Sequence, residues 1–138
     1  MIDMQKFVDA IDVSARSSRK DYHLTLGKAI AMLESLPTDM QVKFDCGPVA
    51  PYDPHSYRGY YSDLAFERGN DTVLVSDFLS QCRAALGAVF EGYKGGDFTM
   101  DNDTPLWASE YGRCSGIAII DLQVREGMAV LVTKQIDE

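Results

Sequence analysis

The chain has 138 residues, of which 46% are hydrophobic, and its 13 basic and 21 acidic residues give a net charge of -8. This length and apolar content suit one domain whose core needs no disulfides, and the negative charge argues against binding of duplex nucleic acid by bulk electrostatics. An odd number of cysteines without CxxC spacing, no signal peptide and no apolar run of roughly 18 residues predict a reducing cytoplasm and no membrane partner.

The first segment expected to be helical covers residues 3–19. Apolar residues recur there at helical spacing, namely Met4, Phe7, Val8, Ile11 and Ala15. We expect residues 1–20 to form an N-terminal helix or arm, which could also be a swapped element, and residues 21–138 to form a single α+β domain.

A second helix is expected to begin after Thr25, which is a plausible N-cap, and to stop at Pro37. Its apolar face consists of Leu26, Ala29, Ile30 and Leu33. Residues 41–45 alternate like a short strand. The glycine and prolines that follow predict an irregular loop; they are Gly47, Pro48, Pro51 and Pro54.

The central part of the chain predicts a strand over Tyr60–Glu67, a turn over residues 68–71 and a helix from about Ser76. An apolar stripe marks that helix, with Phe78, Leu79, Cys82, Leu86, Val89 and Phe90, and Gly87 and Gly92 indicate where it bends or ends. Residues 93–116 show little periodicity and predict a long ordered loop. Residues 116–124 and 128–134 flank Arg125–Gly127 and predict a hairpin.

This order of elements favours an α+β fold, with a small antiparallel sheet and amphipathic helices packed on one face. Adjacent expected strands are not separated by helices, as parallel crossovers would require.

The stretch HSYRGYYSDLAFE places Arg58 and Gly59 among Tyr57, Tyr60 and Tyr61. Flat amphipathic rings and a planar cation suit stacking on a base and pairing with phosphate, and glycine permits close approach of a ligand to the backbone. The structural alternative is an aromatic-rich strand entry whose tyrosines pack on opposite faces.

A second stretch, GYKGGDFTM, repeats the combination with Tyr93, Lys94, Gly95 and Gly96. Consecutive glycines can direct backbone N–H groups at an anion, or they can simply follow a helix end and form a turn. Trp107 is either a core anchor or the lid of a ligand pocket. The predicted binding site therefore comprises Tyr57, Arg58, Gly59, Tyr61, Tyr93, Lys94, Gly95, Gly96 and Trp107.

No motif predicts catalysis, a cofactor or a metal site. The acidic segment from Asp97 to Glu110 lacks the glycine of a calcium loop, and His23 and His55 have no zinc-ligand spacing. Cys114 or Ser115 could be grouped with His55 and Asp97, but no GxSxG pattern supports a nucleophile.

The motifs PHSYRGYYSDLAFE, ALGAVFEGYKGGDFTM and TPLWASEYG, in this order and spacing, resemble a family of small tailed-bacteriophage proteins, over roughly residues 24–116. The family supplies no catalytic residue or cofactor to transfer. The resemblance implies a phage accessory protein in the cytoplasm of the infected bacterial host, acting against host defence.

Two mechanisms compete within that context. The first is a non-enzymatic sponge for a small anionic nucleotide-like signal, resembling anti-Thoeris and anti-CBASS sponges, in which Arg58 and Lys94 bind phosphates, a tyrosine stacks on a base, and subunits assemble into a homo-oligomer. The second is an acidic inhibitor that mimics nucleic acid and binds a host or defence protein directly. A nucleotide-processing enzyme would instead need His55 to meet Asp63, Asp97 or Glu110.

Overall fold

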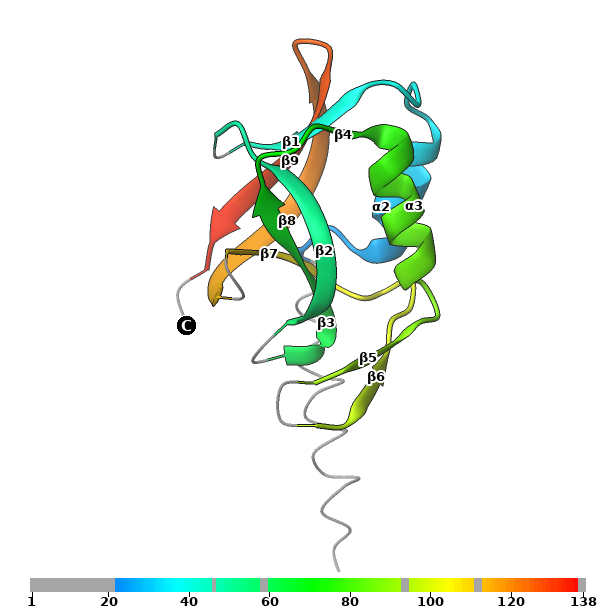
Figure 1. The fold of residues 1–138 in the computed structure, drawn as a ribbon, viewed down its shortest axis with the longest axis vertical. Helices are drawn as coiled ribbons and strands as arrows, with labels where there is room; N and C mark the ends of the chain where they lie inside the picture. Colours follow the sequence, from blue (N-terminus) through cyan, green and yellow to red (C-terminus); the bar gives the residue numbers. More distant parts are fainter. Residues whose placement is uncertain (1–21, 46, 58–59, 93–94, 111–112, 137–138) are drawn as a thin grey trace, which may run out of the picture.

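The computed structural model describes residues 22–45, 47–57, 60–92, 95–110 and 113–136 (Figure 1). The expected helix over residues 3–19 lies outside this part of the chain. In chain order the described elements are α2 (Leu26–Glu34), β1 (Gln41–Phe44), β2 (Ala50–Tyr57), β3 (Tyr60–Gly69), β4 (Val73–Leu74), α3 (Val75–Ala85), β5 (Val89–Glu91), β6 (Asp97–Thr99), β7 (Leu106–Glu110), β8 (Arg113–Arg125) and β9 (Met128–Gln135).

The sheet is mixed, so the expected small antiparallel sheet is wrong. Seven strands pair in the order β2-β3-β7-β8-β9-β1-β4, and β5 and β6 form a separate hairpin. The pairs β3–β7 and β1–β9 are parallel. The chain between β3 and β7 contains α3, which supplies the long crossover that a parallel pair requires. The described residues are mostly strand and contain two helices, α2 and α3.

Both expected helices in the described part are confirmed, with a change at the end of the second. The Thr25 side chain accepts a hydrogen bond from Lys28 N at 3.4 Å and caps α2. Helix α3 ends at Ala85, and Gly87 follows with a positive φ of 80°, a conformation that glycine adopts without strain. The predicted apolar stripe continued to Phe90, but that residue belongs to β5.

The proline-rich segment expected to be a loop forms strand β2, so that prediction is wrong. Strand β2 lies at one end of the sheet and pairs with β3 alone among the described strands. Proline can occupy such an edge because its missing N–H is not needed by a second neighbour. Asp53, with φ of 46°, lies where the β2–β3 register shifts between Tyr52 and His55.

The prediction of a long loop over residues 93–116 is also wrong. It contains β6, β7 and the start of β8, and β7 is central in the sheet, between β3 and β8. Strand β7 has only five residues, which are too few to show the alternation of apolar and polar side chains that indicates a strand. The predicted hairpin is confirmed: β8 and β9 join through Glu126 and Gly127, whose φ values of 52° and 76° suit a tight two-residue turn.

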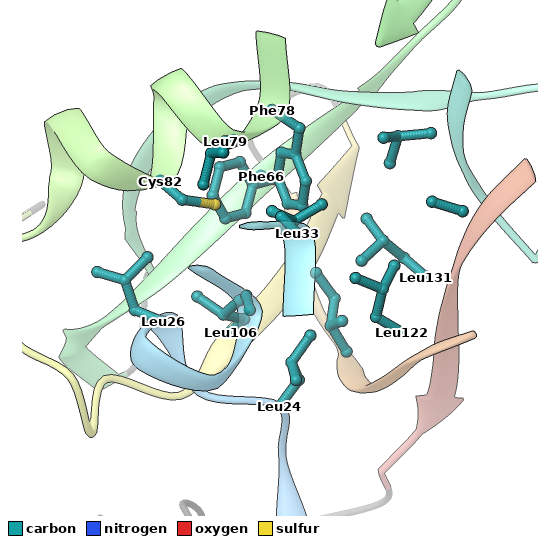
Figure 2. Packing of buried hydrophobic residues seen from close by; sticks show 14 of the residues in the cluster. Leu24, Leu26, Leu33, Phe66, Phe78, Leu79, Cys82, Leu106, Leu122 and Leu131 are labelled. Carbon is teal, nitrogen blue, oxygen red and sulfur yellow. The ribbon is translucent and has the colours of Figure 1, made fainter. Parts of the chain in front are cut away.

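The main hydrophobic core lies between the sheet and the two helices, which lie side by side on one face of the sheet (Figure 1). Figure 2 shows Phe66 of β3 beside Phe78 of α3, and their rings meet edge to face with centroids 5.1 Å apart. Leu106 of β7 and Leu33 of α2 belong to the same cluster. We call this side of the sheet the helix-covered face.

The opposite side is called the second face and carries a smaller buried cluster. Side chains alternate along a strand, so Leu64 and Phe66 point to the helix-covered face while Ala65 points to the second face. On β7 the same alternation places Trp107 on the second face. Several buried polar side chains share that face; they are Asp63, Glu67 and Ser109.

Candidate functional site

Tyr57 and Trp107, both predicted to contact a ligand, meet on the second face. Their rings are stacked, with centroids 4.2 Å apart and an angle of 16° between the planes. Trp107 is in register with Ala65 on one neighbouring strand and with Ala118 on the other. These small side chains leave room for the indole to lie flat across the sheet.

Polar contacts hold this aromatic pair at both ends. The indole Nε1 of Trp107 donates to Asp63 Oδ2 at 2.8 Å, and the Gly116 N–H donates to the Tyr57 hydroxyl at 3.0 Å. His23 meets the indole edge to face, at 4.4 Å between centroids, and its Nδ1 lies 3.0 Å from Leu106 O. The chain segment before α2 is thereby fixed to β7.

Burial limits what the two rings can do directly. Tyr57 is 3% exposed and Trp107 is 2% exposed, so each ring is occupied by protein neighbours. Trp107 has the position of a core anchor, one of the two roles considered for it. The pair can support the adjoining β2–β3 turn, since Tyr57 is the last residue of β2.

The remaining predicted residues of the first motif are described only in part. Arg58 and Gly59 lie outside the described residues, and of Tyr61 only the backbone, within β3, is described. Tyr93 and Lys94 of the second motif also lie outside them.

Gly95 and Gly96 lie in the turn that joins β5 to β6, with φ values of 91° and 88°. Gly95 N donates to Gly92 O at 2.9 Å, and Gly92 N donates to Gly96 O at the same distance. Because these donors are used within the turn, the arrangement fits the turn alternative better than an anion-binding nest at Gly95.

The two motif-bearing hairpins are neighbours in space. Strand β5 contacts β2, and β6 contacts β3. Figure 1 shows the β5–β6 hairpin at the end of the sheet where β2 turns into β3. Segments separated by more than thirty positions in the sequence thus come to one end of the molecule, roughly as the two-loop hypothesis requires.

A polar cluster that the sequence analysis missed joins β2, β3 and β7. His55 Nε2 lies 3.2 Å from Glu67 Oε2 and 3.0 Å from Ser109 Oγ, while its Nδ1 lies 3.0 Å from Ser56 O. The Ser109 hydroxyl donates to Glu67 Oε2. Glu67 and Ser109 are register partners in the parallel β3–β7 pair. One signal in the sequence could have indicated this cluster: Asp63, Ala65 and Glu67 alternate along a strand, which places both carboxylates on the same face of the sheet.

The geometry of this cluster does not match a serine nucleophile. In a catalytic triad the serine and the carboxylate bind opposite nitrogens of the imidazole, whereas here both bind Nε2. Ser109 is also fully buried. The cluster therefore serves as a polar bridge that satisfies buried groups of three strands.

The other groupings considered for chemistry do not assemble within the described residues. Asp63 contacts Trp107 rather than His55, and Asp97 lies exposed on β6. The side chains of Glu110, Cys114 and Ser115 lie outside the described part.

The acidic loop after β6 is organised as a turn. Asp101 Oδ1 accepts a hydrogen bond from Asp103 N at 2.9 Å, and Asp101 N donates to Thr104 Oγ1 at 2.8 Å. Within the described residues, no group of three or more His, Cys, Asp or Glu side chains is placed to hold a metal ion.

No protein-family model, curated protein or solved structure matches the chain significantly. None of the helices in the described part is both long and apolar enough to cross a membrane.

Proposed function

We propose that the protein is a phage-encoded sponge, which binds a small nucleotide-derived signal of a bacterial defence system without converting it. The proposed site lies at the end of the sheet where β5 contacts β2 and β6 contacts β3. The contact of β5 with β2 and of β6 with β3 is the observation that carries the proposal, because these strands flank the SYRGYY and GYKGG motifs in the sequence.

Each predicted site residue has a role in this proposal. Arg58 and Lys94 bind the phosphates of the signal, and Tyr61 or Tyr93 stacks on its base. Gly59 lets the ligand approach the backbone. Tyr57 and Trp107, whose rings are stacked, hold the end of β2 in place. Gly95 and Gly96 shape the opposite turn.

Sequestration accounts for the chemistry better than catalysis does. A general base must reach the reacting group, but the His55 imidazole is held by Glu67 and Ser109, and Asp63 is held by Trp107. A sponge needs affinity alone. We also propose that the site is completed in a homo-oligomer in the cytoplasm of the infected cell.

Mimicry of nucleic acid has less support. The exposed carboxylates in the described part lie on separate elements and turns; examples are Glu34 on α2, Asp53 on β2, Asp77 on α3, Asp97 on β6 and Glu126 before β9. A duplex mimic instead requires acids repeated along one surface to match a basic groove.

The test is mass spectrometry of protein purified from bacteria whose nucleotide-signalling defence is active. Native spectra give the subunit number and any bound mass, and denaturing spectra identify the released ligand. We expect a nucleotide on the wild-type protein and on Lys28→Ala, which removes an exposed charge from α2. Arg58→Ala and Lys94→Ala should lose it while keeping their unfolding temperatures.

Two results would contradict the proposal. One is a protein that carries no small molecule but co-purifies in fixed ratio with a host protein, which would indicate inhibition by contact. The other is unfolding of both Arg58→Ala and Lys94→Ala, which would make those residues structural.

A further inference from the structure

A groove with both polar and apolar walls lies at the opposite end of the β2–β3 hairpin from the proposed sponge site. It consists of two adjoining hollows of about 570 Å³ and 310 Å³, which share Ala50, Asn70, Asp71 and Val73. The larger volume falls within the range of small-molecule sites. Since β2 runs from Ala50 to Tyr57 at about 3.3 Å per residue, roughly 20 Å separates the groove from the turn after Tyr57.

The larger hollow is lined in part by polar side chains that have no hydrogen-bond partner in the described part of the protein. Gln41, Lys43, Asn70 and Thr72 line it, and in the described part of the chain their side chains make no hydrogen bond or ion pair. In contrast, Asp45, just beyond β1, accepts a hydrogen bond from Thr133 N at 3.1 Å. The ammonium of Lys43 and the carboxylate of Asp71 both line this hollow, so it offers one cation beside one anion.

The smaller hollow adds an aromatic surface and a second cation, from Tyr52 and Arg68. Tyr52 is 45% exposed, although its ring rests on the backbone of Gly69. A Cβ at Gly69 would lie 2.7 Å from Tyr52 Cδ1, so only glycine permits this approach. One side of the ring therefore lies against Gly69, and much of the ring is exposed beside the groove.

We propose that this groove binds a nucleoside monophosphate. Lys43 meets the phosphate, Tyr52 stacks on the base, and the amides of Gln41 and Asn70 bond to the base edge. Asp71 lines both hollows, and its carboxylate accepts hydrogen bonds from ribose hydroxyls, the use that dinucleotide sites make of an acidic residue. A simple anion would use the cation but leave the ring and amides without a partner.

The proposal is tested by titrating adenosine 5′-monophosphate into the ¹⁵N-labelled full-length protein and following amide chemical shifts. Binding should move the amides of Gly47, Val49, Ala50 and residues 69–73 and leave those of 95–99 unchanged. Lys43→Gln should weaken binding about fivefold at low salt, as expected for loss of one partly exposed ion pair. Adenosine should bind more weakly and be insensitive to Lys43→Gln.

Two control variants and one further site variant distinguish binding in this groove from binding elsewhere on the protein. Lys28→Gln removes a comparable exposed charge from α2 and should keep wild-type affinity. Asp71→Asn, in an exposed turn, should weaken adenosine and its monophosphate alike. Arg58→Ala should leave this titration unchanged, so failure of the sponge proposal does not alter the result.

Any of three outcomes would overturn the inference. The first is the absence of shifts near the groove at millimolar adenosine 5′-monophosphate. The second is equal affinity of Lys43→Gln and the wild type. The third is inorganic phosphate producing the same shifts at the same concentration.

Discussion

The seven-stranded sheet buries side chains on both faces, and the two faces differ in chemistry. On the helix-covered face, Phe66, Phe78 and Leu106 pack with other apolar side chains against α2 and α3. On the second face, Trp107 shares the surface with Asp63, Glu67 and Ser109, which are all buried. Apolar packing needs only matching shapes, whereas each buried polar group needs a partner. Loss of a single hydrogen bond is therefore expected to lower stability on the second face, where buried polar groups would be left without a partner.

The largest effect on stability is expected on the helix-covered face. Phe66→Ala should lower the free energy of unfolding by about 3–5 kcal/mol, because it removes a fully buried ring and leaves a cavity beside Phe78. Urea unfolding followed by circular dichroism measures the change. Val124→Ala, at a residue 53% exposed, is the matched control and should change little. Equal losses for the two variants would show that this face does not form the main core.

A smaller loss is expected on the second face. Trp107→Phe keeps an aromatic ring but removes the indole N–H that Asp63 Oδ2 accepts at 2.8 Å. Leaving one hydrogen bond of a buried carboxylate unmade should cost about 2 kcal/mol, measured by the same urea titration. Tyr52→Phe, an aromatic change at an exposed site, should stay within about 0.5 kcal/mol of wild type. If both variants behave alike, the Trp107–Asp63 bond does not stabilise the fold.

Near neutral pH the smallest change concerns Cys82, a titratable group of the helix-covered face. Burial raises the pKa of its thiol to about 12, because an apolar environment disfavours the thiolate. An unfolded thiol has a pKa near 9, so stability from this group is complete below that pH and is lost as pH rises toward 12.

Alkylation by iodoacetamide at pH 8 checks this expectation in a variant whose other cysteines are replaced, Cys46→Ser with Cys114→Ser. Cys82 should react at the rate of protein unfolding, and adding urea should accelerate labelling. Rapid labelling of the folded protein would mean that the thiol is accessible and its pKa is not raised.

Local patterns predicted the elements whose signals are continuous in the chain. The N-cap at Thr25, the strand beginning at Tyr60 and the tight turn at Glu126 and Gly127 follow from residue type and spacing. The prolines of β2 and the five residues of β7 gave no such signal, because their strand character depends on neighbours. The edge of the sheet tolerates the prolines of β2, because a proline there lacks only an N–H that no second strand needs. Strand β7 forms because it pairs with β3 on one side and β8 on the other.

The candidate site shows the same division between residue choice and placement. Sequence identified Tyr57 and Trp107 as residues of interest, but their stacking depends on Ala65 and Ala118 from flanking strands. The contact of His55 with Glu67 and Ser109 crosses three strands, and no spacing in the chain encodes it.

The sequence by itself determined the acidic charge, the apolar content and the helices whose period places one face in a core. Only the tertiary structure decided that β3 and β7 are parallel, which polar side chains are buried together and where Lys43, Asp71 and Tyr52 form a groove. The reason is physical: helix and turn preferences depend on residues a few positions apart, whereas strand pairing and burial depend on residues brought together by folding.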